Sequence, residues 1–303
     1  MAVPSPFAAL LAALPVSTDV VRVLGGDTHY WTYGPDDAAT TVVVVHGYRG
    51  EHHGLEPVIA QLRGLRIVSP DLPGFGESGP MTEAPHTIEG YGRWLAAFIA
   101  ELGLEHAIVL GHSFGSIVTS HAVASGVVSP PKLILVNPIA APATSGPNAA
   151  MTRVTVAFYA LSKRLPERLG NWLLGHWVVV RVMSVTMVQT KDRALRRWIH
   201  DQHHTYFSRF SDRETVVEGF NASISTHVGE VGPRIAVPTL LIGAELDPIT
   251  PVVDLHALAD AMPAATLHVI PGVGHLVHYE KPREAAELIV DFLQDGSVAG
   301  GTA

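Results

Sequence analysis

The stretch Leu110-Gly111-His112-Ser113-Phe114-Gly115-Ser116 decides how the rest of this sequence is interpreted, because it has the form Gly-x-Ser-x-Gly. A β-forming run precedes it and a helix-like run follows it. A strand that turns at once into a helix leaves no room for side chains at Gly111 and Gly115. Ser113 at the apex can then be held in a strained backbone conformation with an exposed hydroxyl. The pattern predicts a nucleophilic serine, and a plain Gly/Ser turn is the alternative at this point.

Length and composition narrow the possible classes of protein. The chain has 303 residues, of which 47% are hydrophobic and 16% charged, which suits one α/β domain with an insertion. The absence of cysteine excludes disulfides and thiolate metal sites. A formal charge of −8 argues against a nucleic-acid partner.

The sequence predicts no integral membrane segment, since no uninterrupted apolar run reaches about 18 residues. The apolar run 7–14 has no basic residue before it, unlike a secretory signal. We therefore expect a short amphipathic helix within residues 1–14, with a signal peptide as the alternative, and a cytoplasmic protein. The last residues, 296–303, are expected to be frayed.

Short β-forming runs alternate with helical patterns along most of the chain. The unalternated apolar residues of 41–45 indicate a strand buried on both faces, as in a parallel sheet. We expect an α/β fold with a mostly parallel central sheet and helices on both faces, and with its chemistry at the carboxyl ends of the strands. The expected strands are 20–23, 29–33, 41–45, 65–68, 107–110, 133–136, 239–242 and 266–270.

One segment, 139–222, interrupts this alternation with helical patterns alone. It follows the sixth expected strand and divides the core into 1–138 and 223–303. Residues 151–220 contain eleven Lys or Arg and six Asp or Glu, a formal +5, which leaves −13 for the rest of the chain. We expect this insertion to form a helical cap, or lid, over the edge of the sheet that carries the site.

Three side chains placed just past expected strands predict nucleophilic catalysis. The hydroxyl of Ser113 needs a base to take its proton, and His275 is the candidate. Asp247 is the candidate acid that orients the imidazole and stabilises its charged form, and the chain order is the one this elbow uses. The rivals are Glu245 or Asn137 as the acid and His278 as the base.

The same chemistry needs hydrogen-bond donors for a tetrahedral oxyanion. We expect them to be the backbone N–H groups of Tyr48 and Phe114. His46 and Gly47 are expected to support the loop that carries Tyr48, and His112 is expected to pack beside the elbow.

Together these motifs resemble the α/β-hydrolase superfamily, and more closely its capped, esterase-like or lipase-like members. They occur in family order over about 240 residues. The resemblance implies a cap of helices inserted after the sixth strand, but it does not cover the sequence of that insertion, which selects the substrate. The matching pieces are His46-Gly47, Asp71-x-Pro-Gly-x-Gly-x-Ser78, Gly111-x-Ser113-x-Gly115, Gly243-x-x-x-Asp247-x-x-x-Pro251, Gly274-His275 and Glu280-Lys281-Pro282.

The cap supplies the candidate substrate pocket. Its apolar character favours a medium-sized or long apolar acyl group. Arg49 could meet a substrate carboxylate, although a solvated loop position is the preferred interpretation. The candidate pocket residues are Trp172, Trp177, Met183 and Met187, with packing inside the cap as the alternative role for each.

We expect neither a metal nor another cofactor. The histidine pairs 52–53 and 203–204 could suggest a metal site, but adjacent histidines rarely face one ion together and no carboxylate pattern accompanies them.

These observations lead to a hydrolase that cleaves carboxylic esters of small apolar molecules through an acyl-enzyme. The first alternative is C–C bond hydrolysis in an aromatic-degradation intermediate, which the loop 71–78 suits. Ser116 stands where that branch has a further glycine, and 48–50 is less glycine-rich than its oxyanion loop. Amide or peptide cleavage and cofactor-free perhydrolysis are further alternatives.

Two hypotheses come from other classes. The chain could be a non-catalytic ligand-binding protein on this fold, although a complete set of catalytic residues argues against it. The basic, apolar cap could also dock weakly on anionic lipid surfaces. The oligomeric state and the identity of the substrate are left open.

Overall fold

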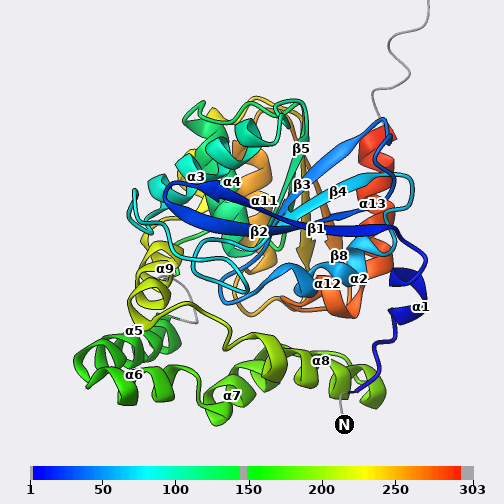
Figure 1. The fold of residues 1–303 in the computed structure, drawn as a ribbon. Coiled ribbons are helices and arrows are strands. Elements are labelled where there is room, and N and C mark those ends of the chain that lie inside the picture. Colours follow the sequence, from blue (N-terminus) through cyan, green and yellow to red (C-terminus); the bar gives the residue numbers. More distant parts are fainter. Residues whose placement is uncertain (1–2, 144–148, 295–303) are drawn as a thin grey trace, which may run out of the picture.

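The computed structural model describes residues 3–143 and 149–294 of the chain. Within these residues, eight strands form one sheet in the order β1-β2-β4-β3-β5-β6-β7-β8 (Figure 1). β1 and β2 form an antiparallel hairpin, β2 is also antiparallel to β4, and the remaining neighbours are parallel. The strands are β1 (Val16–Val23), β2 (Gly26–Tyr33), β3 (Thr41–Val45), β4 (Arg66–Pro70), β5 (Ile108–His112), β6 (Leu133–Val136), β7 (Thr239–Ala244) and β8 (Ala265–Ile270).

The central strands are buried on both faces, as their unalternated apolar sequences predict. In β3, Val43 and Val45 belong to the core on one side of the sheet, and Val42 and Val44 belong to the core on the other. The first side is covered by α3 (Ile88–Glu101), α4 (Phe114–Ala124), α10 (Val228–Val231) and α11 (Val252–Ala261). The second is covered by α2 (Glu56–Ile59), α12 (Val277–Glu280) and α13 (Pro282–Gln294).

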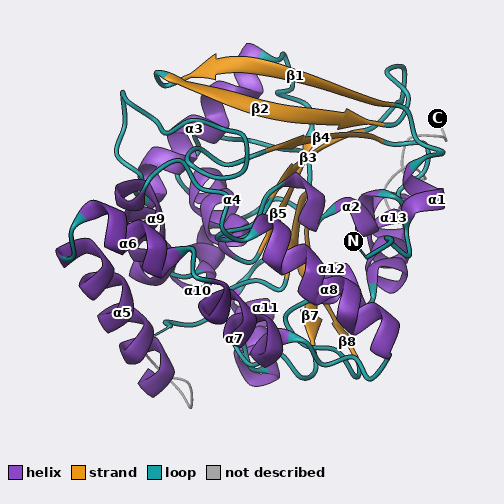
Figure 2. Cartoon of the chain, turned by 60° about the horizontal axis from the view of Figure 1, so that its bottom comes forward, coloured by secondary structure: helices purple, strands orange, loops and turns teal. Residues whose placement is uncertain are grey.

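Helices lie between β6 and β7 and cover the edge of the sheet where the parallel strands end (Figures 1 and 2). They confirm the predicted helical insertion after the sixth strand, and we call them the cap. Their last helix runs three residues past the expected boundary at 222, and the division into two domains stays a prediction. The cap consists of α5 (Ala149–Arg164), α6 (Glu167–Leu174), α7 (Trp177–Met187), α8 (Arg193–Tyr206) and α9 (Arg213–Ser225).

The apolar pattern across 172–188 is interrupted in the structure. α6 ends before Gly175, and α7 begins after His176, whose Nδ1 accepts the N–H of Val178 at 3.3 Å. A side chain that caps the start of a helix satisfies one of its free N–H groups. The break divides this apolar stretch of the insertion between two short helices.

A short helix lies near the beginning of the chain, within the range 1–14 where one is expected. This helix, α1, covers Ala8–Leu11 and follows Pro4 and Pro6. Val3 N–H donates to Asp201 of α8 at 3.1 Å, so the start of the described chain lies against the cap. The expected frayed tail 296–303 lies outside the described residues. No helix among the described residues is long and apolar enough to cross a bilayer.

Candidate active site

The turn between β5 and α4 holds Ser113 in a left-handed conformation, with φ +54° and ψ −117°. Glycine is required on both sides. A Cβ on Gly115 would lie 2.2 Å from the carbonyl oxygen of Val45, and one on Gly111 would lie 2.5 Å from that of Gly115. Because these are backbone contacts, no side-chain movement can relieve them. The two glycines on either side of Ser113 therefore allow the tight turn that holds Ser113 in its strained backbone conformation.

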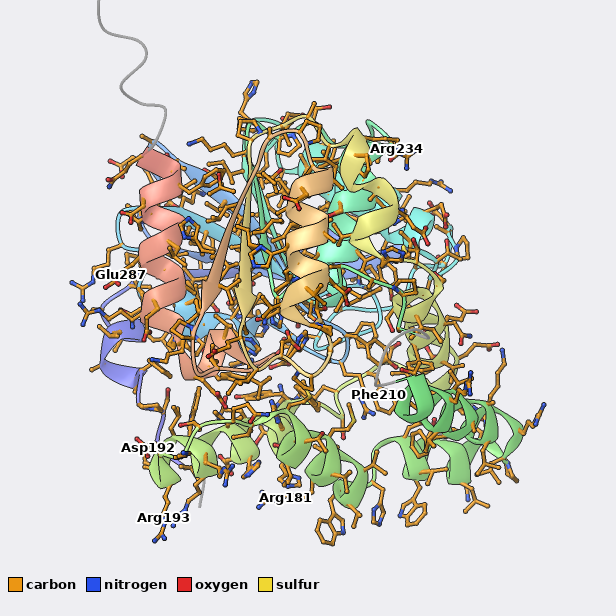
Figure 3. The ribbon with its side chains drawn as sticks, turned by 180° about the vertical axis from the view of Figure 1, so that it is seen from behind. Arg181, Asp192, Arg193, Phe210, Arg234 and Glu287 are labelled. Atoms are coloured by element: carbon orange, nitrogen blue, oxygen red, sulfur yellow. The ribbon has the colours of Figure 1, made fainter. Side chains whose placement is uncertain are left out.

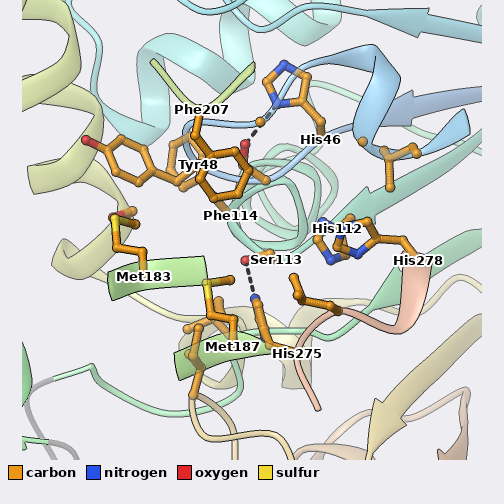
Figure 4. Close-up of a pocket in the computed structure, with 18 of the residues that line it drawn as sticks. His46, Tyr48, His112, Ser113, Phe114, Met183, Met187, Phe207, His275 and His278 are labelled. Carbon is orange, nitrogen blue, oxygen red and sulfur yellow. Dashed lines mark hydrogen bonds between the residues drawn. The ribbon is translucent and has the colours of Figure 1, made fainter. Parts of the chain in front are cut away.

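Three predicted catalytic side chains meet at this edge of the sheet, and Figure 4 shows two of them, Ser113 and His275. The hydroxyl of Ser113 lies 2.8 Å from Nε2 of His275, which follows β8. Nδ1 of the same imidazole lies 2.8 Å from Oδ2 of Asp247, which follows β7. The structure thus brings together a hydroxyl, an imidazole and a carboxylate in the order that nucleophilic catalysis needs.

Asp247 is held by four donors. Oδ2 accepts from His275 and from the side-chain amide of Asn137 at 3.0 Å, and Oδ1 accepts the N–H groups of Ile249 and Thr250 at 2.8 and 3.3 Å. Burial alone would raise the pKa of this carboxyl. The charge and hydrogen bond of His275 and the two amides outweigh burial, so the pKa of Asp247 lies below its ordinary value. The carboxylate is therefore kept ionised beside the imidazole.

The rival groups take other places. Asn137, the alternative acid, supports Asp247 by donating to it. Glu245 accepts the N–H of Gly272 at an exposed position. His278 packs against His112 with ring centroids 4.2 Å apart. Burial lowers the pKa of His278 well below its ordinary value, so this imidazole is neutral.

The loop after β3 carries one of the expected oxyanion donors. Nδ1 of His46 bonds to the carbonyl of Gly47 at 2.8 Å, and Nε2 accepts the N–H of Leu72 at 2.8 Å. Because Nε2 accepts, Nδ1 is the protonated nitrogen, and burial lowers the pKa of His46. The neutral ring thus ties this loop to the loop after β4. Tyr48 and Phe114 both line the cavity that holds Ser113.

A cavity of about 230 Å³ opens onto the hydroxyl of Ser113. The cap closes it with Met183 and Met187 of α7 and with the end of α8 (Figure 4). Among its described lining residues there is no Lys or Arg, and Glu51 is the one carboxylate. Burial, and then the nearby His275, lower the pKa of the lining residue His112 to about 3, so that this ring is also neutral. The space beside the serine is therefore mostly apolar and lacks positive charge from basic side chains.

The alpha/beta hydrolase family matches residues 42–288 of the chain. The chain belongs to this family. Because the match covers β4 to β8, nearly all of β3, the cap and all three side chains of the serine site, the protein is a hydrolase.

This alpha/beta hydrolase has relatives and structural neighbours with different named activities. A 2-hydroxy-6-oxononadienedioate/2-hydroxy-6-oxononatrienedioate hydrolase from Cupriavidus pinatubonensis is 27% identical, over 90% of this chain and 94% of the relative. A thermophilic esterase from Thermogutta terrifontis is 21% identical with a TM-score of 0.73, over 92% of this chain and 98% of the other. An enol-lactonase from Burkholderia xenovorans is 18% identical with a TM-score of 0.75, over 91% and 100%.

Two of the predicted pocket residues of this hydrolase lie elsewhere. Trp172 and Trp177 are 60% and 64% exposed and do not line the cavity, whereas Met183 and Met187 do. Trp172 lies on α6 and Trp177 is the first residue of α7, and both indoles face solvent. Helical periodicity could not predict which side of α7 lines the cavity, because apolar residues lie on both sides of this helix.

Arg49 is not the solvated loop residue that the sequence suggests. It is 1% exposed, with φ +58°, and its guanidinium reaches into the cap. Nε donates to the carbonyl of Phe207 at 2.9 Å and Nη2 to that of Leu174 at 2.8 Å. The neighbouring Tyr48 hydroxyl donates to the carbonyl of Val216 at 2.7 Å. The loop after β3, which carries the expected oxyanion donor Tyr48, is therefore attached to three segments of the cap.

The histidine pairs of the hydrolase make hydrogen bonds within the protein. Potential ligand atoms of Glu51, His52 and His53 lie within 4.8 Å of one another. However, Nδ1 of His52 bonds to Asp71 at 2.9 Å, and Nδ1 of His53 bonds to Glu51 at 2.5 Å. In the other pair, Nδ1 of His203 bonds to the hydroxyl of Ser184 at 2.7 Å. These contacts already use one nitrogen of each of the three rings.

Proposed function

We propose that this hydrolase cleaves carboxylic esters of small apolar molecules through an acyl-enzyme formed on Ser113. The contact between Ser113 and His275 carries the proposal, because it places an acceptor for the serine proton at hydrogen-bond distance. Asp247 holds the other ring nitrogen and stabilises the imidazolium.

The reaction follows from this arrangement. The oxygen of Ser113 attacks the ester carbonyl carbon while His275 takes its proton. The oxyanion accepts hydrogen bonds from the backbone N–H groups of Tyr48 and Phe114. The C–O bond then breaks, His275 gives the proton to the leaving alcohol, and a water molecule releases the acid by the same steps.

The charge of the cavity favours an ester over the dienedioate named for the Cupriavidus relative. A dienedioate carries two carboxylates, and a buried carboxylate needs a cationic or hydrogen-bonding partner. The described cavity lining offers no Lys or Arg and contains Glu51. A neutral ester meets no such penalty, so C–C hydrolysis of a diacid is the second candidate.

The size of the cavity favours a medium acyl chain. Its volume of about 230 Å³ lies below the roughly 300–1,000 Å³ typical of sites for drug-sized ligands. We assign substrate selection to the cap segment 139–222, because Met183 and Met187 of α7 and residues at the end of α8 close the cavity.

Parallel assays on two substrates test the proposal. The purified chain should hydrolyse p-nitrophenyl esters of medium chain length and should be slow on a vinylogous 1,5-diketone diacid. A preference for the diketone would replace the ester assignment with C–C hydrolysis. Tight binding of a substrate without turnover of either class would instead favour a ligand-binding protein.

A further inference from the structure

Helix α7 carries apolar side chains on the side that faces the cavity and also on the side that faces solvent. Met183 and Met187 line the cavity, and Val180 is buried. On the opposite side, Val182 and Val185 are 57% and 55% exposed, beside the exposed polar residues Arg181 and Thr186. A group of exposed apolar side chains on one side of a helix marks a candidate interaction surface.

This outer side continues onto α6 as one apolar surface, which we call the outer cap patch. Its two indoles are separated by His176, whose ring lies 4.5 Å from that of Trp172 and 6.0 Å from that of Trp177. Exposed apolar patches mark interaction sites, and indoles favour the boundary between apolar and aqueous phases. The patch consists of Leu169, Trp172, Trp177, Val178, Val182 and Val185.

A basic groove of about 580 Å³ adjoins the patch. Arg181 and Val185 of α7 line it together with Arg193, Arg196 and Arg197 of α8, and Figure 3 shows Arg181 and Arg193 at the bottom of the molecule. None of these four arginines forms an ion pair with a carboxylate among the described residues. The groove therefore presents four guanidinium groups outside any ion pair, and Asp201 is the carboxylate among its lining residues.

The nearby acids are engaged with backbone groups. Asp192 accepts the N–H groups of Ala194 and Leu195 at the start of α8, and Asp201 accepts that of Val3. Burial, and then the positive charge of Arg181 and Arg196, lower the pKa of His200 in the groove to about 4. The groove is thus a site of positive potential suited to phosphate or another anion.

The charge of this region is opposite to that of the rest of the molecule. Residues 153–197 contain nine Lys or Arg and two Asp or Glu, a formal +7, which leaves −15 for the remaining residues. A neutral or cationic partner would gain no electrostatic attraction from the positive charge of this region. A partner that combines an apolar layer with negative charge fits both the patch and the groove.

We propose that the outer cap patch docks on a bilayer that contains anionic phospholipids. Its indoles and valines enter the boundary between headgroups and acyl chains, and the groove arginines bind headgroup phosphates. Because the opposite side of α7 lines the reaction cavity, docking places that cavity next to the lipid. The docking does not depend on the proposed ester chemistry, so Ser113→Ala should bind vesicles as well as the unaltered chain.

Vesicle binding tests the proposal on the full chain. The protein should co-sediment with vesicles of phosphatidylcholine and phosphatidylglycerol, and its tryptophan emission should shift to shorter wavelength. Binding should weaken in high salt because exposed charges are screened. Replacing Arg181, Arg193, Arg196 and Arg197 with Gln should weaken it by at least about tenfold, since each basic residue near an anionic surface contributes about fivefold.

Two variants separate docking from folding. Trp172→Ser with Trp177→Ser should lose the emission shift and most of the binding, yet still hydrolyse a water-soluble ester normally. Val253→Ser with Arg234→Gln is the matched control, because Val253 is 70% exposed and Arg234 lies at the far end from the cap in Figure 3. This control should bind like the unaltered chain.

Three results would overturn the proposal. Equal binding to phosphatidylcholine alone would remove the role of the arginines. Undiminished binding of the double Trp variant would remove the role of the patch. A dimer in sedimentation that the Trp variant dissociates, without vesicle binding by the unaltered chain, would assign the patch to a second copy of the protein.

Discussion

Ser113 adopts a backbone conformation that residues other than glycine rarely adopt, and hydrogen bonds from neighbouring residues hold it there. Its N–H donates to the carbonyl of Val136 at 3.0 Å, and its carbonyl accepts the hydroxyl of Ser116 at 2.5 Å. The same hydroxyl accepts the N–H of Ile139 at 3.2 Å, which links the elbow to the chain that leaves β6. Strain of this kind persists only where the surrounding structure fixes it.

At the scale of residues, the sequence predicts those side chains whose role depends on a local pattern. The glycines around Ser113 and the loop positions of Asp247 and His275 are of this kind. Asn137 could be seen only as a rival acid, because its contact with Asp247 joins residues 110 apart in the chain. The role of Ser116 also depends on Ile139, which no local pattern brings close.

Asp247→Asn should lower the rate constant for ester hydrolysis by about 10⁴ while the fold is kept. The uncharged amide introduced at position 247 can hold His275 in the wrong tautomer, and it cannot stabilise the positive charge of the imidazolium. Turnover of a p-nitrophenyl ester measures the effect, and circular dichroism checks the fold.

Glu245→Gln is the matched control for that substitution. Glu245 is exposed and has its own contact with Gly272, so the variant should retain normal turnover. A large loss in Glu245→Gln together with a small loss in Asp247→Asn would contradict the assignment of the acid.

At the scale of elements, the alternation of strands and helices predicts the sheet and the position of the cap. The break between α6 and α7 was not predicted, because apolar periodicity continues across Gly175 and His176. The sequence also did not predict which side of α7 faces the cavity, since both sides carry apolar residues. A pattern can place a helix, but packing decides which of its two apolar sides is covered.

Gly115→Ala should disrupt the junction of β5 and α4. Its new Cβ would lie 2.2 Å from the carbonyl oxygen of Val45, which belongs to backbone and cannot rotate away. Loss of several kcal/mol of stability and of nearly all turnover is expected. Gly92→Ala in α3 is the control: its Cβ would meet Ala122 at an ordinary 3.7 Å, so the variant should gain about 0.5–1 kcal/mol. Equal urea midpoints for the two variants would contradict the steric argument.

The burial of Arg49 was missed because it depends on cap segments more than 100 residues away. Arg49→Met should lower the free energy of unfolding by about 2–4 kcal/mol, since the carbonyls of Phe207 and Leu174 lose their partner. Turnover should fall as well, because the oxyanion loop loses an attachment to the cap. Urea denaturation and ester turnover measure the two effects.

Arg63→Met provides the comparison for Arg49→Met, because Arg63 is exposed. This change should leave both the urea midpoint and turnover close to those of the unaltered chain. If Arg49→Met behaved in the same way, the attachment of the loop to the cap would have no energetic role.

At the scale of the whole molecule, buried neutral histidines make stability depend on pH. Burial, and then nearby histidines, lower the pKa of His112 and of His203 to about 3, against an ordinary 6.5. Between these values the unfolded chain binds more protons than the folded one, so stability falls as pH decreases. Well below pH 6.5, each of the two groups should lower the free energy of unfolding by about 1.4 kcal/mol for every unit that the pH falls.

Urea midpoints between pH 7.5 and pH 5 measure this dependence. His203→Leu should reduce its slope, whatever the effect of the substitution on stability at neutral pH. His53 acts in the opposite sense. Burial lowers its pKa, but the hydrogen bond and charge of Glu51, together with the charges of Glu56 and Asp71, outweigh burial and hold the pKa above its ordinary value. A midpoint independent of pH in this range would contradict the neutral state of the buried rings.

Composition predicted the charge asymmetry of the molecule but not its geometry. The basic surplus within 151–220 is visible in the sequence, whereas the grouping of four arginines beside an exposed apolar patch depends on how α7 and α8 pack together.

Covalent labelling tests the central claim most directly. A fluorophosphonate should modify the unaltered chain once, at Ser113, as mapped by peptide mass spectrometry, and Ser113→Ala should be neither labelled nor active on esters. Labelling at a different residue, or ester turnover that survives in Ser113→Ala, would contradict the account.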